Sequence, residues 1–128
     1  MLTTEPGCRN LLIRRIVMLG GCLISAWSSS AIGATVAFET EVAPILRQHC
    51  LSCHHADNAE GGLSLSSSTA LTQGGDSGPL VSPGDPDASM LLEMVSGSEP
   101  QMPQDAAPLS AEQIATLRQW ISQGANWP

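Results

Sequence analysis

The sequence predicts a small all-α domain with about three helices. Capping signals followed by apolar residues at helical spacing mark helices near residues 85–97 and 110–124, and a third apolar stripe lies near 40–49. The chain between 56 and 84 is rich in glycine and serine, which favours irregular structure.

The first helix is expected from about Thr40 to His49. Its apolar residues fall near one face at helical spacing, and they are Phe38, Val42, Ile45 and Leu46. Pro44 fits a helix only in its first turn, so the helix cannot begin much before Thr40.

In the following segment the glycine pairs Gly61-Gly62 and Gly74-Gly75 are interpreted as ordinary turn residues. Leu63 and Leu65 alternate with serines, which indicates a short extended stretch between them.

The second helix is expected to start at Asp85-Pro86, an N-cap followed by a proline at the first helical position. Its apolar stripe is Met90, Leu91, Met94 and Val95, and Gly97 ends it.

The third helix begins with a capping box, with Ser110 at N-cap and Gln113 three residues later. Its buried stripe consists of Ile114, Leu117 and Ile121 with Trp120 beside them, and Gly124 closes it.

Residues 1–34 have the pattern of a secretory signal peptide, which leaves 35–128 as the mature domain. A basic start (Arg9, Arg14 and Arg15) precedes a 12-residue apolar run at 16–27 that is too short to span a bilayer. Small residues at 28–34 supply cleavage sites. Two alternatives stay open, namely a retained anchor, and lipidation of Cys22 in a lipobox-like sequence. In either case the protein is expected to be exported, to the periplasm or an equivalent compartment.

The expected mature domain is strongly acidic. Eleven of the twelve acidic residues lie in 35–128 but only two of the five basic ones, Arg47 and Arg118, so the charge of this part is near −9. Nucleic acid and anionic membrane surfaces are poor partners for such a protein, whereas a partner with a basic docking face fits it. The acidic residues serve solubility equally well.

The motif Cys50-Leu51-Ser52-Cys53-His54 predicts covalent attachment of one haem c. Two cysteines separated by two residues can present both sulfurs to one edge of the porphyrin, and the next residue, His54, can then bind iron. The alternatives are a zinc site, a redox dithiol and a structural disulfide. A zinc site usually needs a second cysteine pair, and a redox dithiol needs a βαβ pattern that the sequence lacks. Removal of 1–34 also removes Cys8 and Cys22, so no thiol is left for a disulfide framework.

Met102 is the favoured second iron ligand. It lies in the proline-bracketed segment 99–103 between the second and third helices, and prolines reduce the entropy cost of holding one side chain in place. Met90 and Met94 are expected to be core residues, and His49 and His55 are too close to the attachment motif to reach the opposite face of the porphyrin. Ligation by His54 and Met102 would fill both axial positions, which describes an electron carrier and not an enzyme that activates oxygen.

From Phe38 onward the chain resembles the planctomycete-type cytochrome c domain, a branch of the class I-like c-type cytochromes. The resembling stretches are VAPIL at 42–46, CLSCH at 50–54, GGLSL at 61–65, GGDSGP at 74–79, PGDP at 83–86, MP at 102–103 and WISQGANWP at 120–128. The sequence departs from the family pattern at His55, where glycine is frequent, and at Gln104, where a second proline is usual.

The resemblance implies an all-α fold around one haem c, with thioether links to Cys50 and Cys53 and axial ligands His54 and Met102. It also implies that the Pro79 carbonyl accepts a hydrogen bond from the proximal imidazole. Arg47 and Trp120 are candidate contacts for the haem propionates. The function expected is that of an exported mono-haem electron carrier. The alternatives are a haem enzyme or gas sensor with a labile distal site, and a haem-bearing docking subunit of a larger oxidoreductase.

Overall fold

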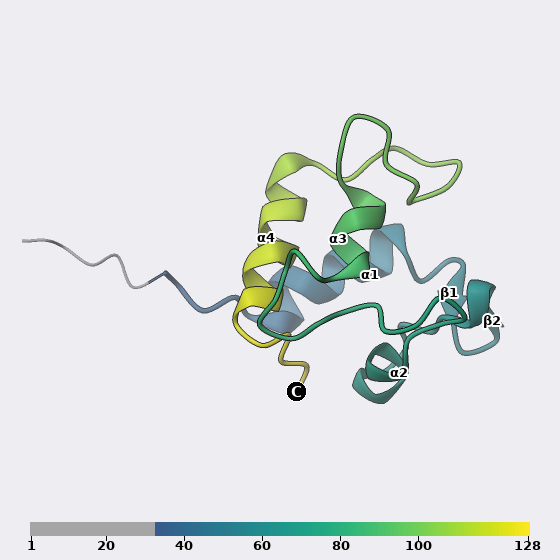
Figure 1. Ribbon diagram of the computed structural model, residues 1–128, viewed down its shortest axis with the longest axis horizontal. Helices are drawn as coiled ribbons and strands as arrows, with labels where there is room; N and C mark the ends of the chain where they lie inside the picture. Colours follow the sequence, from purple (N-terminus) through teal and green to yellow (C-terminus); the bar gives the residue numbers. More distant parts are fainter. Residues whose placement is uncertain (1–32) are drawn as a thin grey trace, which may run out of the picture. The chain divides into compact units, whose positions relative to one another are not determined.

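The computed structural model describes residues 33–128. The expectations for the signal peptide, the anchor and Cys22 therefore lie outside the described residues, except that residues 33 and 34 of the expected signal peptide are described. The elements follow one another as η1 (Phe38–Val42), α1 (Ala43–His49), β1 (His54–His55), β2 (Asn58–Ala59), η2 (Glu60–Gly62), α2 (Ser68–Gln73), α3 (Met90–Val95) and α4 (Ala111–Ser122). Figure 1 shows α3 and α4 as neighbours, with α2 and the two short strands gathered at the opposite side of the domain.

The first predicted helix is present and begins slightly earlier than expected. One π-helical turn, η1, runs directly into α1, and Pro44 lies in the first turn of α1 as its missing N–H requires. The chain leaves α1 through Cys50, whose N–H donates to the Leu46 carbonyl. The attachment motif therefore starts at the C-terminal end of this helix.

The prediction of a purely all-α fold is wrong in one detail. Two-residue strands β1 and β2 pair antiparallel, with His54 opposite Ala59 and His55 opposite Asn58. The same segment also contains helix α2, where irregular chain was expected. Ser67 caps α2 by accepting from the Ala70 N–H at 3.2 Å, and Gly74 ends it at a φ of 74°. The fold remains predominantly helical and small.

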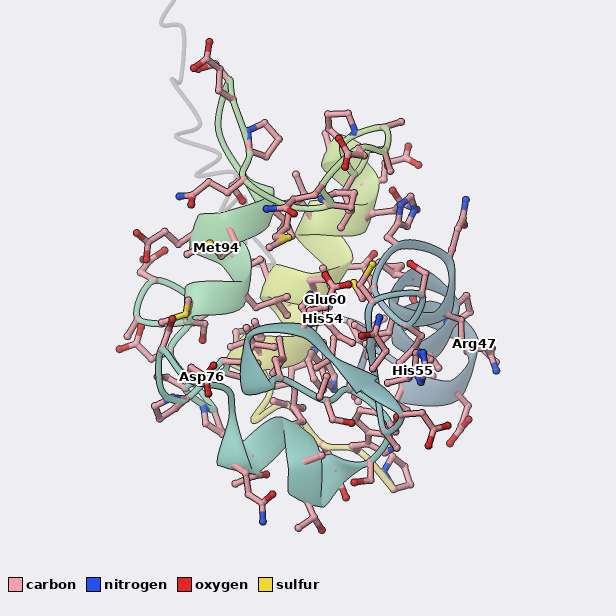
Figure 2. The ribbon with its side chains drawn as sticks, turned by 90° about the vertical axis from the view of Figure 1, so that its right-hand side faces the viewer. Arg47, His54, His55, Glu60, Asp76 and Met94 are labelled. Atoms are coloured by element: carbon pink, nitrogen blue, oxygen red, sulfur yellow. The ribbon has the colours of Figure 1, made fainter. Side chains whose placement is uncertain are left out.

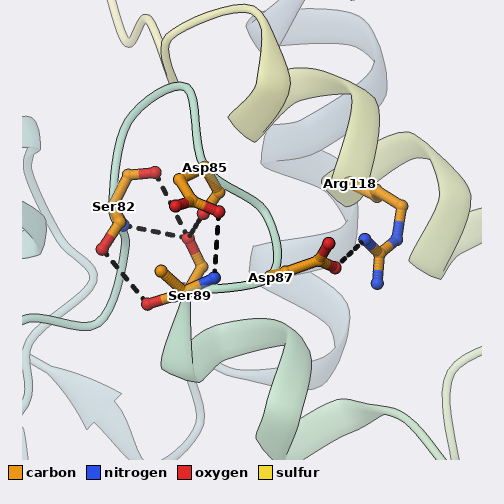
Figure 3. Close-up of polar contacts among 6 residues, drawn as sticks. Ser82, Asp85, Asp87, Ser89 and Arg118 are labelled. Atoms are coloured by element: carbon orange, nitrogen blue, oxygen red, sulfur yellow. Dashed lines mark hydrogen bonds and ion pairs between the residues drawn. The ribbon is translucent and has the colours of Figure 1, made fainter.

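Helix α3 begins later than predicted. The Asp85 side chain accepts from the Ala88 N–H at 3.1 Å, so Asp85-Pro86 builds a turn, and the helix starts at Met90 after Ser89. The hydroxyl of Ser89, which is only 2% exposed, donates to the Asp85 carbonyl at 2.8 Å and accepts from the Ser82 N–H at 2.9 Å. Figure 3 shows this serine at the centre of the hydrogen bonds that hold the turn.

Helix α4 has the capping box that the sequence predicted. Ser110 Oγ accepts from the Gln113 N–H at 3.2 Å, and Gln113 Oε1 accepts from the Ser110 N–H at 2.8 Å. Leu117, Trp120 and Ile121 are buried on the inner face of this helix.

The core joins η1, α1, α3 and α4. Phe38 stacks against Trp127 with ring centroids 4.3 Å apart and lies 5.9 Å from Trp120. The Trp120 indole N–H donates to the Asn126 carbonyl at 2.9 Å, so the C-terminal tail closes over this end of the core. In residues 33–128, no helix is long and apolar enough to cross a membrane.

Candidate haem-binding site

A cavity of about 620 Å³ lies between the attachment motif, helix α3 and the loops around them. This volume is in the range of about 300–1,000 Å³ that is typical of cofactor and ligand sites. Its walls are mainly apolar, with four leucines and a valine: Leu63, Leu65, Leu80, Leu91 and Val95, joined by Leu109. The domain thus has an apolar space of cofactor size that its own side chains leave open.

The attachment motif forms one tight turn at the edge of this cavity. The N–H groups of Cys53 and His54 donate to the Cys50 carbonyl at 3.2 and 3.0 Å. Cys50, Cys53 and His54 all line the cavity, and both cysteines are free thiols. A single turn therefore brings the two sulfurs and the imidazole to the same cavity, as the spacing of the motif predicted.

The two thiols differ in their surroundings. Burial raises the pKa of the Cys50 thiol to about 11 because the apolar surroundings disfavour the thiolate. The Cys53 sulfur lies 3.8 Å from the Ser52 hydroxyl.

The His54 ring is held through its Nδ1 atom, which lies 3.1 Å from the Glu60 carbonyl oxygen. With Nδ1 protonated and donating to this carbonyl, Nε2 is left with the lone pair that binds metals. The resemblance to class I cytochromes implied that the Pro79 carbonyl would hold this proton, but in the structure the acceptor is Glu60. Figure 2 shows His54 beside Glu60, with Met94 on α3 at the upper left.

Met102 lines the same cavity as His54 and is half-buried. Its N–H donates to the Met94 carbonyl at 2.9 Å, which fastens the loop between α3 and α4 to the end of α3. Met90 and Met94 were expected to be core residues, but both are half-buried and both line the cavity. The site therefore contains three thioethers, of which Met102 is the one on a loop.

The two other histidines are placed differently. His55 does not line the cavity, and its Nδ1 accepts from the Asp57 N–H at 3.2 Å. His49 does line it, and its Nε2 lies 3.1 Å from Gln113 Nε2, so the residue before Cys50 is tied to the start of α4. This contact could not be predicted from the sequence, because the two residues are far apart along the chain.

Neither candidate for contact with the propionates lines the cavity. Trp120 is 2% exposed with its indole N–H bonded to Asn126, and Arg47 lies outside the lining on the exposed face of α1. The charged lining residues other than histidine are both acidic, Glu60 and Asp105. In the described part of the chain, no three His, Cys, Asp or Glu side chains are grouped so that they could hold a metal ion.

One protein family is similar to the segment that contains this motif. The model of the planctomycete cytochrome C family matches residues 50–105. This segment of the chain is therefore similar to the planctomycete cytochrome C family. No curated protein and no solved structure matches the chain.

The match confirms the predicted resemblance over residues 50–105, and similarity to a cytochrome c domain implies haem c as the cofactor. The residues present in the cavity fit that group: two free thiols on one turn, an imidazole with its Nε2 free, and an apolar wall. Sequence reasoning missed the Glu60 carbonyl, because any backbone carbonyl nearby could accept the imidazole proton and the residue type carries no signal.

Proposed function

We propose that this cytochrome is an exported mono-haem electron carrier and not an enzyme. In this proposal Cys50 and Cys53 form the thioether links, His54 is the proximal iron ligand and Met102 is the distal ligand. The observation that carries it is that one apolar cavity collects all four side chains, although Met102 lies 48 residues after His54 in the sequence.

The roles of the residues follow from their contacts. Cys50 and Cys53 fix the position of the cofactor edge, and His54 is oriented by the Glu60 carbonyl. Met102 is carried by a loop that its N–H bond to Met94 fastens to α3. When bound, the haem supplies an iron atom that is reduced and oxidised by one electron.

The walls of the cavity set the conditions for this couple. Leu65, Leu80 and Leu91 are buried and give the site an apolar wall. An apolar wall and a neutral thioether ligand both favour ferrous iron over ferric iron, so they raise the reduction potential. With both axial positions taken by protein side chains, oxygen would have to displace a ligand in order to bind.

The proposed partners are redox proteins with a basic docking face. The charge near −9 of residues 35–128 supports this, as does the partial exposure of Cys50 and Cys53, which leaves the thioether edge as a route for electron exchange. Export is supported by the signal-like pattern at 1–34 and by the need to attach haem c outside the cytoplasm.

An absorption spectrum of the ferric protein tests the ligand set. A far-red charge-transfer band from methionine sulfur to iron, with low-spin iron and no rapid binding of CO in the ferrous state, is expected for the carrier. High-spin ferric iron that readily binds cyanide, without the far-red band, would instead support the enzyme or gas sensor.

A further inference from the structure

The Glu60 carbonyl that faces His54 lies on a turn that is held by hydrogen bonds of both the Glu60 N–H and the Glu60 carbonyl. The Glu60 N–H donates to the Cys53 carbonyl at 3.2 Å, and its carbonyl accepts from the Leu63 N–H at 3.3 Å as well as facing His54 Nδ1 at 3.1 Å. The turn is therefore tied to the attachment motif itself.

A second loop, residues 74–78, packs against this turn through backbone atoms. The Asp76 N–H donates to the Gly61 carbonyl at 2.8 Å. The Gly75 N–H donates to the Gly78 carbonyl at 3.1 Å, and the Gly78 N–H donates to the Gly75 carbonyl at 2.9 Å. These two hydrogen bonds close the loop into a turn. Figure 2 shows Asp76 at the left of the His54–Glu60 pair.

Glycine is required where the two loops touch. A Cβ atom at Gly75 would lie 2.6 Å from the Gly61 carbonyl oxygen and 3.1 Å from Leu63 Cβ. A Cβ atom at Gly62 would overlap the Asp76 carboxylate and lie 2.9 Å from its Cγ. These glycines do more than form ordinary turns, which is the role that the sequence alone indicated for them.

We infer that Gly62 and Gly75 are positioning residues for the proximal imidazole. Their missing side chains let the 74–78 loop press on the 60–62 turn, and this packing holds the Glu60 carbonyl at His54 Nδ1. The inference rests on the proposed function, because it concerns His54 as an iron ligand.

The hydrogen bond between His54 and Glu60 should affect the reduction potential of a bound haem iron. A hydrogen bond from Nδ1 to a carbonyl gives the imidazole more anionic character, which stabilises ferric iron and lowers the potential. Displacing the Glu60 carbonyl weakens this bond, so the potential should rise and the Nδ1 proton should exchange faster with solvent.

Gly75→Ala is the direct test in the haem-loaded protein. Gly75 has a φ outside the left-handed region, so alanine meets only the contact with Gly61 and Leu63. We expect a higher potential and faster exchange of the His54 Nδ1 proton measured by NMR. The control is Gly97→Ala, a residue at a φ of 97° with open space around it and away from the cavity. It should lose stability without moving either quantity.

A second set of variants keeps the inference testable if Gly75→Ala does not fold. Gly62→Ala should raise the potential, because the new methyl group meets Asp76. Gly62 has a φ of 69°, so alanine is strained there in any background, and Asp76→Ala removes only the overlap with the carboxylate. The shift that Gly62→Ala causes should therefore be smaller in the Asp76→Ala background than in the wild type. A double variant that keeps the full Gly62→Ala shift would contradict the packing argument.

The outcomes separate the two proposals. If the wild-type protein carries no haem, or if His54→Ala leaves the iron spectrum unchanged, the proposed function fails. If the wild-type protein shows His54-ligated haem but Gly75→Ala leaves both the potential and the proton exchange unchanged, only the positioning role fails.

Discussion

Met102 and Met94 place two sulfurs at the same cavity, and they are distinguished by the elements that carry them. Met94 belongs to α3, whereas Met102 lies on a loop whose backbone is hydrogen-bonded to Met94. A loop can bring a side chain to the metal without moving a packed helix, so Met102 is the better candidate ligand.

The Met102→Ala variant should therefore lose the far-red sulfur-to-iron band, gain rapid CO binding in the ferrous state and show a lower reduction potential, since a thioether favours ferrous iron. Met94→Leu, which keeps size and apolar character, should retain the band. The assignment would be wrong if Met94→Leu lost the band and Met102→Ala kept it.

Cys50 carries a prediction for the haem-free protein. Its raised pKa of about 11 means that the thiol is protonated at neutral pH, and the thiolate is the form that reacts with alkylating agents. We expect alkylation of Cys50 by iodoacetamide in Cys53→Ala to be slow at pH 8 and to rise about tenfold per pH unit until the pH nears 11, as for any single ionisation. A rate independent of pH between 8 and 10 would show that the thiol is not buried in this way.

At the level of residues, the sequence predicted which side chains share one site wherever the residue type carries the signal. The spacing of Cys50, Cys53 and His54 and the proline-bracketed Met102 are visible in the printed chain, and the structure gathers them at one cavity. Glu60 and His49 could not be predicted, because their contacts depend on a backbone carbonyl and on a partner distant in sequence.

At the scale of elements, the entry to α3 depends on Ser89. Its buried hydroxyl serves both the Ser82 N–H and the Asp85 carbonyl (Figure 3), whereas the nearby Ser96 hydroxyl is buried without a hydrogen-bond partner. The two serines flank the same helix, which makes them a matched pair.

Ser89→Ala should lower the free energy of unfolding by about 1–3 kcal/mol, because it removes the hydrogen bonds of the buried hydroxyl to the Ser82 N–H and the Asp85 carbonyl. Ser96→Ala removes a hydroxyl that has none and should be neutral or slightly stabilising. Urea unfolding of the haem-loaded variants measures both. Equal losses for the two serines would contradict the role of the Ser89 network.

Helix α4, which has both a capping box and an apolar stripe, was predicted correctly. The start of the second helix was misplaced because Asp85-Pro86 favours a turn as readily as a helix start. Helix α2 was not predicted, although Ser67 caps its start and Gly74 ends it, because the many glycines and serines of this segment favour irregular structure.

For the molecule as a whole, the net charge gives rise to the interaction with the longest range. Residues 35–128 carry eleven acidic side chains against Arg47 and Arg118, and Arg118 is paired with Asp87 at 2.6 Å. This surface pair is exposed on both sides, so it contributes little to stability, and the excess negative charge faces solvent.

Electron transfer to a lysine-rich redox protein should therefore slow as salt is added. Between about 10 mM and 500 mM ionic strength the Debye length falls from roughly 30 Å to a few ångströms. The bimolecular rate measured by stopped flow is expected to drop about tenfold or more. An acidic redox protein serves as the control and should react faster as salt increases. If the rate with the basic partner does not depend on salt, the proposed docking role is wrong and the acidic surface serves only solubility.

The intact mass of the protein purified from the exported fraction shows whether one haem is bound covalently through residues 50–54. We expect the mass of a chain cleaved near residue 34 plus one haem, and no haem after denaturation of the Cys50→Ala, Cys53→Ala double variant. A haem-free protein of unmodified mass, or one that releases bound zinc, would contradict the account.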